Sequence, residues 1–188
     1  MLPLLLLTTM QPLTAQTHKN LIINGDFSQG NSGFSSQYTF DQDLNPTGNY
    51  FIGGNPFECH HGGASFGDHT SGSGKMMIIN GATDAGVSIW KQTVKVQPNR
   101  KYFFGAWAAS WGQFGNPGTD PSPARLILCV NGKPIAPAFT LNSQDGAWTK
   151  YFASWKSGSA KSAELSIVDE NLEGIGNDFA IDDLTFHD

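Results

Sequence analysis

Hydrophobic and polar residues alternate along several short segments of the chain, and turn-forming residues separate these segments. In the segment 87–96, Trp90, Gln92, Val94 and Val96 fall on one side, and a more polar set falls on the other. A period of two is typical of a β-strand with one buried face. No window shows sustained helical spacing with capping residues at its ends. The pattern therefore predicts an all-β chain.

The same reasoning predicts further strands elsewhere in the chain. Asn131 and Gly132 give a strong hairpin signal, and a long polar stretch, 28–75, contains two short aromatic islands at 37–40 and 49–52. About eight short strands separated by turns predict an antiparallel β-sandwich or jelly roll. Besides 87–96, the predicted strands are 20–23, which is followed by a turn at 24–26, and 76–81, 101–110, 124–130, 147–155, 163–170 and 178–186.

The length of 188 residues fits one domain after the N-terminus is set aside. Residues 1–17 resemble a secretory signal peptide, with an apolar run from Leu2 to Leu7 and Ala15 at a cleavage position. The alternative is an apolar terminus without a targeting role. We expect residues 18–188 to form a single β-sandwich domain that is secreted or displayed on the cell surface.

Charge, the length of apolar runs and the cysteine content indicate which partners and cross-links to expect. The net charge is −5 and the Lys and Arg residues are scattered, which argues against nucleic acid as a partner because phosphate binding needs clustered cations. The apolar run at the N-terminus is too short to span a bilayer, and no later segment is long enough, so no membrane insertion is expected. Cys59 and Cys129 could form one disulfide in an exported chain, or remain buried thiols.

Three segments in a fixed order carry a family resemblance. NLIINGDFSQG, VSIWKQTVKVQPNRKYFFGAWAAS and DFAIDDLTF together resemble the galactose-binding-like jelly roll, especially carbohydrate-binding modules of the family 4, 9 and 22 type. The block 50–82 resembles domains in large surface and secreted proteins of Bacteroidetes-type bacteria. The resemblance implies two facing sheets, a polysaccharide or glycan ligand, and a structural calcium ion that joins the first strand to the last.

The calcium ligands that the resemblance implies are Asp26, Ser28 and Asp182. Calcium prefers several oxygen ligands from carboxylates and carbonyls. Strand alternation should send Asp182 and Asp183 to opposite faces, and the family pattern favours Asp182. Ser28 stands where the family often has Glu, which removes a charged ligand. The alternative is that Asp26 caps a turn and the Asp pair is solvated.

Aromatic residues supply the candidate ligand surface. Sugars present apolar C–H faces that stack on aromatic rings, and Trp107 and Trp111 fall on one face of segment 101–110 and its extension, together with Phe103, Gly105 and Ala109. These two indoles could floor a cleft, or they could belong to the core, as large aromatics usually do. Trp90 and Trp155 are assigned to the core or its edge. The predicted rim residues are Tyr38, Tyr50, Gln113 and Asn116.

The sequence gives little support for a zinc site or a catalytic site. A zinc site from Cys59, His60, Asp68 and His69 matches no standard spacing, and we expect Asp68 to order its loop by accepting backbone N–H groups. No pair of carboxylates and no nucleophile motif can be assigned. The sequence therefore predicts a non-catalytic carbohydrate-binding module, with a surface adhesion or protein-interaction domain second and a glycan-active enzyme third.

Overall fold

The computed structural model describes residues 18–112 and 119–188, so the predicted signal peptide, 1–17, lies outside the described residues. Within them, the chain forms two sheets. The larger sheet has the order β1 (Thr39–Phe40), β2 (Asn49–Gly53), β3 (Met76–Asn80), β11 (Asp178–His187), β5 (Lys101–Ser110) and β9 (Thr149–Lys156). The smaller sheet contains β4 (Ser88–Lys95), β10 (Ser162–Asp169), β6 (Arg125–Val130) and β7 (Lys133–Pro134), with β8 (Phe139–Thr140) paired to β6.

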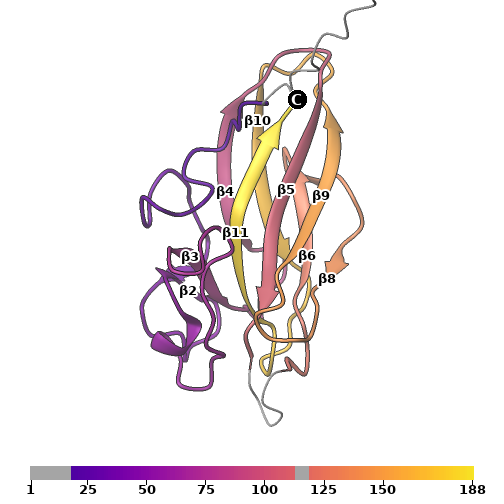
Figure 1. Ribbon diagram of the computed structural model, residues 1–188. Coiled ribbons are helices and arrows are strands. Elements are labelled where there is room, and N and C mark those ends of the chain that lie inside the picture. The colour runs from indigo at the N-terminus through magenta and orange to yellow at the C-terminus, as the bar shows by residue number, and fades with distance from the viewer. Residues whose placement is uncertain (1–17, 113–118) are drawn as a thin grey trace, which may run out of the picture.

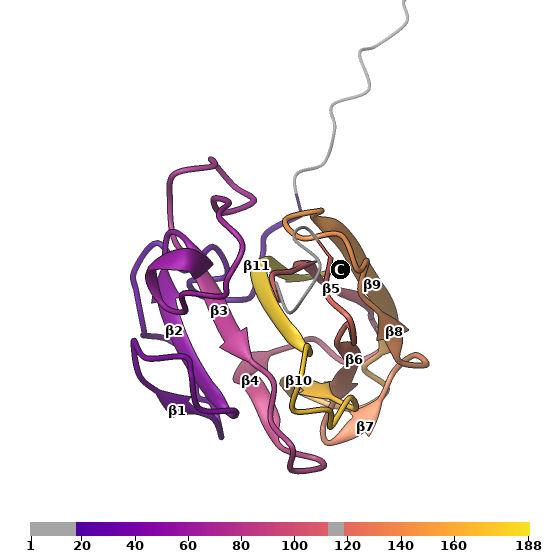
Figure 2. The same ribbon diagram turned by 90° about the horizontal axis from the view of Figure 1, so that it is seen from below.

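The two sheets face each other, and the main core lies between them. Figure 1 shows β11 and β5 in front of β10 and β6, and the view from below in Figure 2 shows the same two layers end-on. Alternate residues of β5, such as Tyr102 and Phe104, enter this core beside Trp90 of β4. All strand pairs of the sandwich layers are antiparallel except the short β1–β2 pair in the described residues. The predicted all-β sandwich is therefore confirmed.

The strand predicted at 20–23 is wrong, although this segment does run beside β11, and the turn predicted at 24–26 is confirmed. Leu21 N–H donates to the Phe186 carbonyl, and Leu184 N–H donates to the Gly25 carbonyl. The Asn20 side chain makes hydrogen bonds to β11 that a neighbouring strand would make with its backbone. Its Nδ2 donates to the Leu184 carbonyl, and its Oδ1 accepts from the Phe186 N–H. The segment is thus fixed to the last strand without becoming one.

The hairpin signal is confirmed, and the disulfide is not formed. Asn131 and Gly132 both have positive φ, 53° and 71°, as the type I′ turn between β6 and β7 requires. Cys59 and Cys129 are free and buried. Cys59 follows the 3₁₀ helix η1 (Pro56–Glu58), whereas Cys129 lies in β6 of the other sheet. Facing sheets lie about 10 Å apart, which exceeds the reach of a disulfide.

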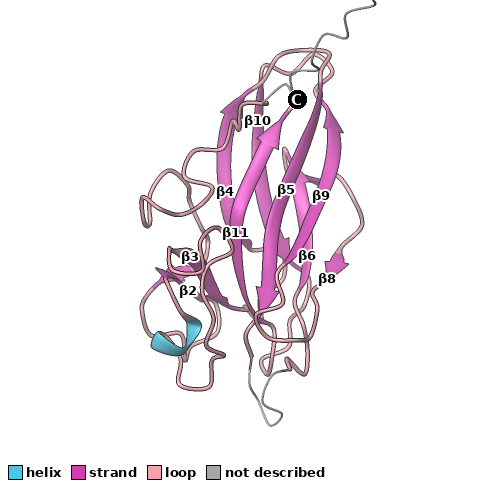
Figure 3. Ribbon diagram, viewed as in Figure 1, coloured by secondary structure: helices cyan, strands magenta, loops and turns pink. Residues whose placement is uncertain are grey.

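The loop between β2 and β3, residues 54–75, covers part of the outer face of the larger sheet. It contains η1, the cyan turn in Figure 3, and Figure 2 shows it rising above β2 and β3 away from the second sheet. A second apolar cluster forms beneath it and joins loop residues Cys59 and Ala64 to Met76, Ile78 and Trp111. None of the helices among the described residues is long and apolar enough to cross a membrane.

Candidate functional site

The outer face of the larger sheet carries the exposed Phe152 and the half-buried Phe103 and Trp107. Phe103, Gly105 and Trp107 alternate on β5 with the buried residues of the main core. Strand register places Phe152 of β9 on one side of Gly105 and Thr185 of β11 on the other. Residues from three strands that are distant in sequence therefore meet on one surface.

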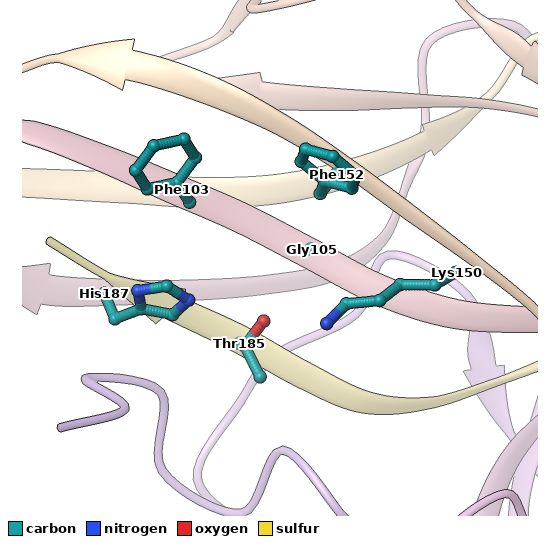
Figure 4. Close-up of a pocket in the computed structure, with 6 residues that line it drawn as sticks. All are labelled: Phe103, Gly105, Lys150, Phe152, Thr185 and His187. Atoms are coloured by element: carbon teal, nitrogen blue, oxygen red, sulfur yellow. The ribbon is translucent and has the colours of Figure 1, made fainter. Parts of the chain in front are cut away.

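A shallow depression of about 320 Å³ lies at this meeting point. Figure 4 shows Phe103 and Phe152 beside each other next to Gly105, with the Lys150 side chain extending toward Thr185. Phe152 is 69% exposed, which is unusual for a phenylalanine on a strand. The depression is lined by Phe103, Gly105, Lys150, Phe152, Thr185 and His187. We call these six residues the Phe103–Phe152 platform.

Gly105 has no side chain and so leaves space on the surface of the platform. A Cβ atom at this position would lie 3.1 Å from the Tyr151 carbonyl oxygen, 3.2 Å from the Phe152 Cβ and 3.3 Å from the Thr185 Oγ1. Any larger side chain would crowd the neighbouring strands and fill the space between the two phenyl rings. The glycine thus leaves room for a flat ligand to lie against aromatic carbon.

Trp107 continues the platform along β5, but the 54–75 loop covers it in part. The His69 ring stacks on the Trp107 ring with centroids 3.8 Å apart and planes 17° apart. His69 Nδ1 lies 2.7 Å from a carboxylate oxygen of Asp183, which holds the imidazole in place. Trp107 is therefore half-buried, and its indole lies under His69 at the edge of the open surface.

The prediction that Trp111 floors a cleft is wrong. Its side chain does lie on the outer face, as the alternation indicated, but the 54–75 loop covers it completely and its exposed fraction is 0%. Its Nε1–H donates to the Phe179 carbonyl over 2.9 Å. A buried indole with a satisfied N–H is a core residue.

The predicted rim residues do not join the platform. Tyr38 and Tyr50 belong to the main core, with exposed fractions of 7% and 5%. The Tyr38 hydroxyl accepts from the Ala82 N–H, and burial raises the pKa of Tyr38. The Tyr50 hydroxyl bonds to the Asn31 side chain. The remaining predicted rim residues, Gln113 and Asn116, lie outside the described residues.

The expected calcium ligands make hydrogen bonds within the protein. Asp26 is exposed, and its Oδ1 accepts from the Ser28 hydroxyl at 2.9 Å. Asp182 is fully buried and accepts backbone N–H bonds from His69, Thr70 and Asp183. These N–H groups bond to the oxygens that a cation would need. They argue against the calcium ion that the resemblance implied at Asp26, Ser28 and Asp182.

A β-bulge explains why Asp182 and Asp183 do not point to opposite faces as expected. Register shifts between Asp182 and Thr185, and Asp183 has a φ of 47°. Both carboxylates consequently meet the same loop, since Thr70 Oγ1 bonds to each of them. Burial, opposed by the backbone N–H bonds, raises the pKa of Asp182 to about 7. The pair anchors the 54–75 loop to the last strand.

The zinc alternative is not supported either. Asp68 accepts from the Ser71 N–H and the Gly74 N–H, which confirms its predicted role in ordering the loop. His69 is engaged with Trp107 and Asp183. In the described ranges, no three His, Cys, Asp or Glu side chains form a group that could hold a metal ion.

Three carboxyl groups that sequence reasoning did not single out gather at the other end of β11. Asp120 and Asp178 are 3% and 2% exposed, and each has one buried oxygen without a hydrogen-bond partner. Burial, and then the nearby Asp120 and Asp145, raise the pKa of Asp178 to about 8. Burial and Asp120 raise the pKa of Asp145 to about 6. Because the first two are sealed from solvent, they offer no acid–base pair to a polysaccharide.

No family model matches the chain, and no curated protein matches it in sequence. Solved structures do match in fold. The xylan-binding CBM22-1 domain of Xyn10C from Paenibacillus barcinonensis is 12% identical, with 93% of this chain and 97% of that chain covered and a TM-score of 0.56. A family 16 carbohydrate-binding module is 17% identical, with 90% and 100% covered and a TM-score of 0.51.

An arabinose-bound α-L-arabinofuranosidase is also similar, at 11% identity and a TM-score of 0.57. The match covers 90% of this chain but 26% of that one. At these identities the likeness concerns the fold. The jelly-roll fold of carbohydrate-binding modules, expected from the ordered sequence segments, is confirmed.

Proposed function

We propose that the protein is a secreted, non-catalytic carbohydrate-binding module that binds a polysaccharide on the Phe103–Phe152 platform. The observation that carries this proposal is the pair of phenyl rings held next to Gly105 on an open sheet face. Aromatic rings match the apolar C–H face of a sugar. Thr185, Lys150 and His187 supply polar groups that can bond to its hydroxyls.

The similar structures support the same assignment. Two of them are named as carbohydrate-binding modules and match over nearly their whole length. The platform lies on a shallow, open part of the sheet face, which suits a chain-like ligand better than a small enclosed one. An open surface of this size gives modest affinity, since it buries little of its ligand.

The test is loss of binding after removal of the aromatic groups. Phe103→Ala and Phe152→Ala should each weaken binding to a polysaccharide panel by about tenfold, or about 1.4 kcal/mol. Phe57→Ala is the matched control, because Phe57 is 51% exposed but lies in η1, away from the platform. Affinity electrophoresis in gels that contain each polysaccharide measures the effect.

Binding that survives both platform substitutions would reject this surface. Release of reducing sugars from the panel would instead favour a glycan-active enzyme. An effect of Phe57→Ala as large as that of Phe152→Ala would place the ligand elsewhere.

A further inference from the structure

We propose that the polysaccharide bound by the platform is anionic, bearing carboxylate or sulfate groups; this inference rests on the proposed function. It follows from the charges that surround the two phenyl rings. The chain as a whole carries a net charge of −5, yet this face is rich in lysine.

Three lysines lie on the outer face of β5 and β9. Lys101 shares the side of β5 that carries Phe103, and its Nζ lies 5.0 Å from the centroid of that ring. Lys150 lines the depression beside Phe152. Lys156 follows Phe152 at an even spacing on β9, so it projects from the same face.

These lysines are arranged unfavourably for a protein surface without a ligand. Lys101 and Lys156 are directly opposite each other across the β5–β9 pair, and like charges in that position repel. In the described parts of the chain, the ion pairs of lysine and arginine involve Lys91 and Arg125 instead. An anionic ligand would supply the negative charge that this face lacks.

Among the described residues, no acidic side chain forms an ion pair with these three lysines. Asp183, on the outer side of β11, is held by His69 and Thr70. Asp188 follows β11 and is exposed beyond its end.

Lysine also protects edge strands from pairing with other chains, and β9 is an edge strand. That role predicts no ligand preference, so a binding experiment separates the two explanations.

The experiment uses ligand pairs that share a sugar backbone and differ in the presence of charged groups. Polygalacturonate is compared with its methyl ester, and dextran sulfate with dextran, each immobilised for biolayer interferometry at 50 and 500 mM NaCl. The variants are Lys101→Gln/Lys150→Gln and, as a control with the same change in net charge, Lys95→Gln/Lys133→Gln. Lys95 and Lys133 are exposed on β4 and β7 of the other sheet.

We expect one anionic ligand to bind at least tenfold more tightly than its neutral counterpart. The platform double variant should bind the anionic ligand about tenfold more weakly. Raising NaCl to 500 mM should also lower the affinity about tenfold, since salt screens exposed charges. The control double variant should bind within twofold of the unmodified protein.

Equal binding to charged and neutral partners, insensitive to salt, would overturn the anionic preference and leave the proposed function in place. An equal loss in the control variant would also overturn it, because the attraction would then come from overall charge. If Phe152→Ala leaves all binding unchanged, the proposed function itself fails.

Discussion

The buried carboxyl group of Asp178 should make the stability of the fold fall as pH rises. Its side chain is 2% exposed, and burial together with Asp120 and Asp145 raises its pKa to about 8 from an ordinary value of 3.8. The folded state therefore holds this proton more tightly than the unfolded chain does. Between pH 4 and pH 8, each rise in pH favours unfolding.

The size of the effect follows from the two pKa values. One pKa unit corresponds to about 1.4 kcal/mol. At pH 5 Asp178 is protonated in the folded state and largely ionised in the unfolded chain, so the bound proton stabilises the fold. At pH 8 this contribution to the free energy of unfolding is nearly lost. The free energy of unfolding should thus fall by up to about 4 kcal/mol between pH 5 and pH 8 through this residue.

Urea unfolding followed by tryptophan fluorescence at pH 5 and pH 8 measures this difference. Asp178→Asn removes the titrating group and keeps its shape, so the pH-dependent loss should shrink by up to about 4 kcal/mol. Burial lowers the pKa of His60, which acts in the opposite direction, but the comparison of the two proteins cancels it. A fold that becomes more stable toward pH 8, or a variant with unchanged pH dependence, would refute the reasoning.

Three further predictions concern residues whose expected roles the structure changed or left open. Trp111→Ala should destabilise the protein by about 3–5 kcal/mol because it empties a buried site, whereas Phe152→Ala should change stability by less than about 0.5 kcal/mol; urea unfolding compares them, and equal losses would contradict the assignment of Trp111 to the core. A calcium chelator should leave the melting temperature unchanged, since N–H donors occupy Asp182; a clear drop would restore the predicted calcium site. Dithiothreitol should likewise have no effect on thermal unfolding, because Cys59 and Cys129 are free, and a lowered melting temperature would indicate a disulfide.

Strands whose side chains alternate between core and solvent could be predicted from the sequence. The side of β9 that carries Lys150, Phe152 and Ser154 follows directly from its period of two, and the structure matches it. The segment 20–23 misled the same reasoning, because the side chain of Asn20 takes over bonds that a strand would make with its backbone. The hydrophobic periodicity of a segment does not reveal that a side chain will make hydrogen bonds in place of the backbone.

The candidate site was only partly accessible to sequence reasoning. Alternation placed Trp111 on the outer face correctly, but the cover over it comes from a loop some fifty residues earlier, and such packing leaves no local pattern. The bulge at Asp183 likewise involves a positive φ, which the alternation of residues does not indicate. One local signal pointed to the platform: Phe152 alternates with the core-facing Tyr151 and Ala153, which leaves a phenylalanine on the solvent side.

The most direct test of the account is an amide chemical-shift titration of the isotope-labelled protein. The probe is a short oligosaccharide of whichever polysaccharide the electrophoresis retains. We predict that the largest shifts fall on the amides of the platform strands, at 103–105, 150–152 and 185–187. Shifts confined to the smaller sheet, or to the loop around His60, would contradict a binding surface between Phe103 and Phe152.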